Sequence, residues 1–235
     1  MIDEDTYVTH SDEKIEIHGR KDKEVFMFND YLDNKLVLDK WQKIGVFCLT
    51  IVTSGLFGWI YEFFFYYINF GMKKFYWQGG NFLPWINIYA YGAIMIMILV
   101  RKFKRKPLLV FLIAFFSTGV LEYFSGYVIY KYFGGLRLWD YNTEIWNFLN
   151  IDGFVCFRSV FFFGLSSFIL VYLMIPAFIY LARHLKRRTF LIISIGLFSV
   201  VLFDEIYNLI IARLFRLPRA RNIYSKIGFN YMNYK

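Results

Sequence analysis

The sequence predicts an all-α fold, a polytopic transmembrane helix bundle, and three observations support this class. Hydrophobic residues make up 58% of the 235 residues, and aromatic residues alone make up 23%. The mean hydropathy is positive, at +0.41. The apolar residues gather in runs of about 20 or more, which is the length that crosses a hydrocarbon core about 30 Å thick. A soluble domain has no use for so many long apolar runs.

Five apolar runs predict five membrane helices, and the second run has the weakest pattern. They are Ile44–Phe70, Phe82–Val100, Leu108–Phe133, Phe154–Ala182 and Phe190–Leu214. The connection Gly134–Asp152 is rich in aromatic residues that suit a membrane interface, so a re-entrant piece there would make six membrane elements. The runs define a transmembrane domain over residues 43–215, followed by a basic C-terminal tail over residues 216–235.

The segment before the first run, residues 1–42, has a different character. It is charged and poor in apolar periodicity, and it lacks the basic-then-apolar pattern of a cleavable signal peptide. Its few apolar residues are spaced loosely enough for an amphipathic helix on the membrane surface. We therefore expect either an N-terminal cytoplasmic tail or an interfacial helix.

Basic loops predict the orientation in the cell membrane, because Lys and Arg are retained on the cytoplasmic side. Arg101–Lys106 and Arg183–Arg188 are the two basic connections, and they place the N-terminus in the cytoplasm. Five crossings then put the basic C-terminal tail outside, and a re-entrant piece would not move it, so the side of the tail stays open. These loops also explain the net charge of +9, and no nucleic-acid reading module accompanies them.

Acidic side chains in the apolar runs predict a polar site inside the bundle. Glu62, Glu122 and Asp204 follow the nearest basic anchor by 16 to 19 residues, which at about 1.5 Å per residue is roughly 24–28 Å of depth. Glu205 adjoins Asp204, and Arg158 reaches the same layer from the other side. A carboxylate in hydrocarbon costs roughly 2.5–3.5 kcal/mol, so such side chains face the interior and find partners. We therefore expect Arg158 to pair with one or more of these acids.

The surroundings of these acids fit a closely packed polar interior. Small residues share a helical stripe with Glu62 and with Glu122, which lets helices approach closely. The connection Leu138–Asn142 could close over this layer from outside. Two interpretations stay open: a functional cavity that faces the outer leaflet, and a set of buried ion pairs that only fixes helix register.

Several short motifs, taken together and in order, resemble a known membrane family. They are Gly58-Trp59-Ile60-Tyr61-Glu62, Gln78-Gly79-Gly80-Asn81-Phe82-Leu83, Tyr89-Ala90-Tyr91-Gly92-Ala93, Leu121-Glu122-Tyr123, Leu138-Trp139-Asp140-Tyr141-Asn142 and Asn150-Ile151-Asp152-Gly153-Phe154-Val155-Cys156, followed by Ser159 and Gly164. The family is described as "putative ABC-transporter type IV", or CmpB-like, and its members are labelled "putative ABC transporter permease". The resemblance covers about residues 50–180.

The resemblance implies a small integral membrane protein without a defined activity. The family's recurrent positions, carried over to this chain, are Trp59, Glu62, Gly92, Glu122, Tyr123, Trp139, Asp140, Tyr141, Asn150, Gly153, Cys156 and Ser159. The chain departs from the family at two places. It has Pro84-Trp85-Ile86-Asn87-Ile88 where the family has a Gly-Pro-x-Cys-Pro stretch, and Ile175-Pro176 where the family has His-Pro.

These observations favour a transporter-type, permease-like subunit. Carboxylates at this depth can carry protons or bind cations. The sequence contains no Gly-x-x-x-x-Gly-Lys-Ser/Thr loop, so an ATPase would be a separate subunit, and a homo-oligomer could supply further helices. The candidate substrate- or ion-binding residues are Glu62, Glu122, Asp140, Arg158, Asp204, Trp59, Tyr123, Trp139, Tyr141 and Asn150.

Two alternative functions remain at this stage. One is a membrane-embedded enzyme that acts on a lipid or lipid-linked substrate, and the other is a non-catalytic scaffold or accessory protein. Neither a histidine-based nor a zinc-binding catalytic arrangement is visible, which argues against an enzyme. The sequence indicates no particular cofactor and no metal, and its evident partner is the lipid bilayer.

Overall fold

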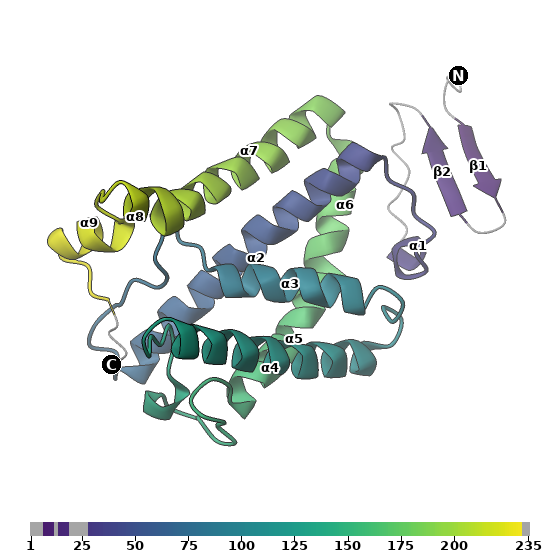
Figure 1. Ribbon diagram of the computed structural model, residues 1–235. Coiled ribbons are helices and arrows are strands. Elements are labelled where there is room, and N and C mark those ends of the chain that lie inside the picture. The colour runs from purple at the N-terminus through teal and green to yellow at the C-terminus, as the bar shows by residue number, and fades with distance from the viewer. Residues whose placement is uncertain (1–6, 12–13, 19–27, 232–235) are drawn as a thin grey trace.

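The computed structural model describes residues 7–11, 14–18 and 28–231, and helices dominate it (Figure 1). Four helical segments are long and apolar enough to cross a membrane. They are α2 (Lys40–Asn69), α4 (Pro107–Tyr132), the run of α5 (Phe157–Ile169), η2 (Leu170–Met174) and α6 (Ile175–His184), and the run of α7 (Arg187–Ile206), η3 (Tyr207–Ile211) and α8 (Ala212–Leu214). A fifth apolar helix, α3 (Asn87–Leu99), is shorter. The predicted all-α membrane bundle is confirmed.

Local sequence signals explain where the long helices begin and bend. Asp39 caps α2, because its carboxylate accepts the backbone N–H groups of Trp41 (2.7 Å) and Gln42 (3.0 Å). Pro107 opens α4 at a position where no backbone donor is needed. Pro176 lies just inside α6 and cannot donate to the preceding turn, and the wide π-helical turn η2 lies directly before it.

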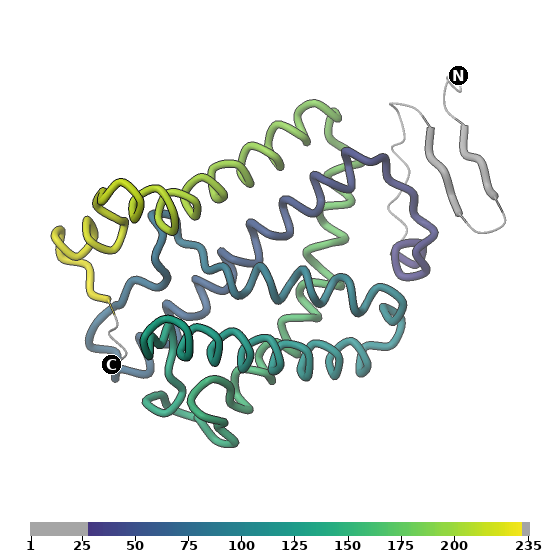
Figure 2. The backbone as a smooth tube through the Cα atoms, in the orientation of Figure 1, coloured from purple at the N-terminus to yellow at the C-terminus, as the bar shows by residue number. Residues whose placement is uncertain are grey.

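Helix α2 lies at the centre of the bundle and contacts α3, α6 and α7, while α4 packs mainly on α5 (Figure 2). Two glycines of α2 allow the close approach of aromatic rings. A Cβ atom at Gly55 would lie 2.1 Å from the Trp85 indole, and one at Gly58 would lie 2.1 Å from the Tyr89 ring. The missing side chains are therefore what admits these rings, which agrees with the small-residue stripe in the sequence.

The bundle has two ends, which we call the basic end and the distal end. The basic end contains the connections 101–106 and 183–188, and there Arg187 Nε lies 3.5 Å from Asp39 Oδ2 at the start of α2. The distal end contains the connections 70–86 and 133–156 together with the tail after Leu214. Trp77 N–H donates to the Asn230 carbonyl there (2.8 Å), so the C-terminal tail lies at the end opposite the basic loops. Which end faces the cytoplasm stays a prediction.

The second helix is shorter than the predicted Phe82–Val100, because it begins at Asn87. Pro84 disfavours a helical conformation for the residue before it. The Trp85 indole N–H instead donates to the Val52 carbonyl (3.1 Å), and Ile86 N–H donates to the Gly55 carbonyl (3.1 Å). The segment 78–86 therefore enters the bundle as non-helical chain. Such backbone is tolerated at membrane depth only where protein groups satisfy it.

The described part of the N-terminal segment contains two short strands and a short helix, and its role as a tail or an interfacial segment stays a prediction. Strands β1 (Tyr7–Ser11) and β2 (Lys14–His18) pair antiparallel, in agreement with their β-branched, alternating sequence. The short helix α1 (Phe28–Leu32) follows and is attached to the basic end. The Tyr31 hydroxyl donates to the Val171 carbonyl (2.9 Å), and Arg105 Nη2 donates to Asp33 (2.9 Å).

Candidate functional site

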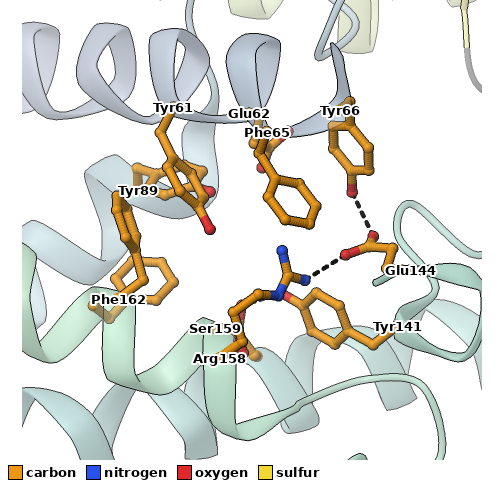
Figure 3. Close-up of a pocket in the computed structure, with 12 residues that line it drawn as sticks. Tyr61, Glu62, Phe65, Tyr66, Tyr89, Tyr141, Glu144, Arg158, Ser159 and Phe162 are labelled. Atoms are coloured by element: carbon orange, nitrogen blue, oxygen red, sulfur yellow. Dashed lines mark hydrogen bonds and ion pairs between the residues drawn. The ribbon is translucent and has the colours of Figure 1, made fainter. Parts of the chain in front are cut away.

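A small polar cavity lies at the distal end, enclosed by α2, α3, α4, α5 and the connection before α5 (Figure 3). Its volume is about 20 Å³, which is enough for about one water molecule. The lining residues are Tyr61, Glu62, Phe65, Tyr66, Tyr89, Glu122, Tyr141, Glu144, Arg158, Ser159, Phe162 and Phe163. Of the predicted site residues, the structure brings Glu62, Glu122, Tyr141 and Arg158 together here.

Glu62 occupies the α2 side of the cavity and is partly buried. The Tyr89 hydroxyl on α3 interacts with its carboxylate. The Tyr89 ring reaches this place because Gly58, one turn before Glu62, has no side chain to exclude it. Glu62 is therefore coupled to α3 through a hydroxyl group, and its charge interaction with Arg158 is not a direct ion pair.

Glu122, on α4, has a hydroxyl partner for each of its oxygens. The Tyr141 hydroxyl donates to Oε1 (2.6 Å), and Ser159 Oγ lies 2.6 Å from Oε2. Only 4% of the Glu122 surface is exposed. The same Ser159 oxygen lies 2.8 Å from the Cys156 carbonyl. The single Ser159 hydroxyl proton therefore faces two acceptors.

Arg158 projects into the middle of the cavity from α5 and ion-pairs with Glu144, at 2.5 Å between Nη2 and Oε2 (Figure 3). The Tyr66 hydroxyl donates to the other Glu144 oxygen (2.5 Å), and the Arg158 guanidinium stacks on the Phe65 ring at 3.9 Å. Arg158 Nε is buried without a hydrogen-bond partner. The expected partner of Arg158 was one of Glu62, Glu122, Asp204 and Glu205, so the observed partner is a different acid.

Glu144 is the charged residue of the cavity that the sequence analysis missed. It lies in the connection before α5 and not in an apolar run, so counting depth along helices could not find it. Its position three residues after the motif residue Tyr141 was the available signal. Its side chain is 2% exposed, and this burial raises the pKa of Glu144 even though Tyr66 and Arg158 act in the opposite direction. Burial likewise raises the pKa of Tyr141 well above its usual value.

Other predicted residues build the loop behind the cavity and do not line it. Asp140 Oδ1 accepts the Asn142 backbone N–H (3.1 Å) and caps η1 (Tyr141–Thr143), which holds Tyr141 in place. Trp139 donates to the Phe154 carbonyl (2.9 Å), and Asn150 donates to Asn142 (2.7 Å).

Tyr123 lies at the exposed edge of this loop, where its hydroxyl donates to Asp152 (3.1 Å). The predicted residues Asp140, Trp139, Asn150 and Tyr123 are thus placed as supports of the distal connection.

Asp204 and Trp59 lie elsewhere. Asp204 accepts the backbone N–H groups of Phe82 (3.0 Å) and Leu83 (2.7 Å), and so it satisfies the non-helical segment before α3. We call this group the α3-entry cluster; its members are Asn81, Asn87, Asp204, Glu205 and Asn208. Trp59 donates to the Gln78 carbonyl (3.1 Å). The layer of acids predicted from depth is therefore divided into two separate groups.

No group of three or more His, Cys, Asp or Glu side chains within residues 28–231 has the arrangement of a metal site. The cavity is lined by three carboxylates, one guanidinium and four tyrosine side chains, and it has space for about one water.

Comparison with known proteins identifies the family but no individual relative. A family model described as "Putative ABC-transporter type IV" matches residues 49–209, which include every residue that lines the cavity. Neither the curated protein sequences nor the solved structures gave a significant match. The match extends beyond the resemblance over residues 50–180 and takes in Asp204 and Asn208 of the α3-entry cluster. The chain is therefore a membrane protein that belongs to the family described as "Putative ABC-transporter type IV".

Proposed function

We propose that this protein is a transporter-type, permease-like subunit whose distal cavity takes up a proton. The observation that carries the proposal is the convergence of Glu62, Glu122 and Glu144 with the single cation Arg158 around about 20 Å³ of space. A cavity of this size has room for a water molecule and not for a lipid head group.

The charges in the cavity support this assignment. Three carboxylates face one guanidinium, and that guanidinium is engaged by Glu144. Two further negative charges in a buried site are costly, and uptake of a proton would relieve that cost. At Ser159 one hydroxyl proton faces both Glu122 and the Cys156 carbonyl. A proton on Glu122 would complete this hydrogen-bond set.

The energy source and the partner are further parts of the proposal. The chain lacks a phosphate-binding ATPase loop, so ATP-driven work would need a separate ATPase subunit. Such a subunit would dock at the basic end, where short connections are exposed. An assembly of several copies of the chain is the alternative source of additional helices.

Proton flux into lipid vesicles tests the proposal. The purified full chain is reconstituted with a trapped pH-sensitive dye, and a pH gradient is applied. We expect wild-type vesicles to acidify faster than empty ones, and Glu122→Gln vesicles to match empty ones while the variant melts like wild type. Asp30→Asn is the control, because this carboxylate lies in α1 at the basic end. Retained flux in Glu122→Gln would contradict the role of the cavity.

One observation favours a second function, that of a non-catalytic scaffold. Glu144 links Tyr66 of α2 with Arg158 of α5 in a nearly dry contact, so the cavity residues also hold the distal connection to the bundle. A scaffold predicts wild-type flux equal to that of empty vesicles and a lower melting temperature for Glu122→Gln. The same experiment therefore separates the two functions.

A further inference from the structure

A second, larger cavity lies at the basic end, between α2 and α3. Its volume is about 460 Å³, within the range of about 300–1,000 Å³ that is typical of ligand pockets. It shares no lining residue with the distal cavity. We call it the basic-end groove, and its principal lining residues are Phe47, Ile94, Met97, Ile98, Arg101 and Lys102.

The two parts of the groove differ in chemistry. Its wall is apolar and open to the surroundings, since Ile98 is 69% exposed and Phe47 is 42% exposed. Both residues lie on apolar helices of the membrane bundle, where exposed apolar side chains meet lipid chains. Its end is cationic, because Arg101 and Lys102 close it, and no acidic side chain lines it.

These two cations are available for an external anion. Both are exposed, and neither forms an ion pair with any residue in the described part of the chain. Two other cations of the same connection are already engaged. Arg105 pairs with Asp33, and Lys104 turns inward to donate to the Tyr31 carbonyl.

The connection that carries the two cations is held in place by hydrogen bonds. The Tyr172 hydroxyl donates to the Lys104 carbonyl (2.7 Å), and Asn34 Nδ2 donates to the Arg101 carbonyl (3.1 Å). Phe103 N–H donates to the Val100 carbonyl at the end of α3 (2.8 Å). The backbone that carries the two cations is therefore held next to the apolar wall by the fold.

We propose that the basic-end groove binds one anionic phospholipid. The lipid phosphate lies against Arg101 and Lys102, and an acyl chain lies along Phe47, Met97 and Ile98. Basic pockets between membrane helices suit anionic head groups, and the apolar wall at the same place requires a lipid and not a free anion. This inference does not depend on the proposed transport function.

Native mass spectrometry of the purified full chain tests the site with two lipids of equal acyl composition, phosphatidylglycerol and phosphatidylcholine. We expect the protein to retain phosphatidylglycerol preferentially. Removing both charges in an Arg101→Gln/Lys102→Gln variant should weaken that binding about 25-fold, since each cation near an anionic lipid contributes about a fivefold factor. The matched control is Lys186→Gln/Arg188→Gln, which removes two exposed cations at the same end outside the groove. This control should bind phosphatidylglycerol like wild type.

A third variant, Ile98→Trp, fills the apolar wall and keeps both cations. It should lose the bound lipid, and excess inorganic phosphate should not displace the lipid from wild type. The proposal is overturned if Arg101→Gln/Lys102→Gln binds phosphatidylglycerol like wild type, or if the control loses as much. It is also overturned if Ile98→Trp retains the lipid or if phosphate displaces it, because the site would then recognise a free anion.

Discussion

Replacing Arg158 with methionine should destabilise the protein by about 3–5 kcal/mol, because the substitution leaves the Glu144 carboxylate buried without its cation. The burial of both partners in the structure supports a loss of this size. The Glu144 side chain is 2% exposed and that of Arg158 is 12% exposed, so bulk solvent reaches little of either partner. At about 2–4 °C per kcal/mol for a chain of this length, the melting temperature should fall by about 6–20 °C.

A double replacement separates the ion pair from simple loss of packing. Glu144→Leu alone should also destabilise, because it leaves the Arg158 guanidinium buried and unpaired. The Arg158→Met/Glu144→Leu double variant removes both charges and should lose less stability than the two single variants added together. The measurement is thermal unfolding in detergent, followed by intrinsic fluorescence.

The cost of Arg158→Met should depend on pH. Burial raises the pKa of Glu144. A carboxyl whose folded pKa exceeds its unfolded value contributes stability below the unfolded pKa, and this contribution is lost as pH rises through the folded pKa. Without Arg158 that pKa is expected to rise further, so the loss should be largest at pH 8 and should shrink towards pH 5. A variant that melts like wild type at every pH, or a double variant with strictly additive losses, would refute the reasoning.

Three further outcomes follow from single contacts. Gly58→Ala places a Cβ atom 2.1 Å from the Tyr89 ring and should cost about 1–3 kcal/mol by thermal unfolding, whereas the control Gly196→Ala meets no atom within 4 Å and should not destabilise. Asp204→Ala removes the acceptor of two backbone N–H groups before α3, so hydrogen exchange across residues 78–86 should accelerate; unchanged exchange would contradict that role. Burial lowers the pKa of Lys104 to about 8, so wild-type stability should rise between pH 8 and about 9.5, and Lys104→Met should lack this rise in a pH series of melting curves.

The long apolar runs were predictable from the sequence because the thickness of the membrane sets the number of consecutive apolar residues that a spanning helix needs. The start of α3 was not, because it depends on Trp85 and Ile86 bonding to the backbone of α2, a contact between segments more than 30 residues apart. Hydropathy along the chain contains no information on such a contact. The second helix predicted from hydropathy therefore began too early and included Pro84.

Only the part of the candidate site that lies on the apolar helices was predictable, because the prediction compared the depths of acidic residues along those helices. Depth counting grouped Glu62, Glu122 and Asp204, but equal depth does not mean the same side of a helix bundle. Asp204 lies on α7 and faces the α3-entry cluster instead of the distal cavity. Glu144 was not predicted as a site residue, because depth can be counted only along helices and Glu144 lies in a loop. It is nevertheless the acid that pairs with Arg158.

The α3-entry cluster also has a consequence for how the chain is assembled in the membrane. Synthesis proceeds from the N-terminus, so residues 78–86 enter the bilayer before the last long helix exists. Until α7 arrives, the N–H groups of Phe82 and Leu83 lack the Asp204 carboxylate that satisfies them in the finished protein. Exposed backbone donors are costly in lipid. We therefore expect the second helix to reach its final place only after the last long helix has been inserted.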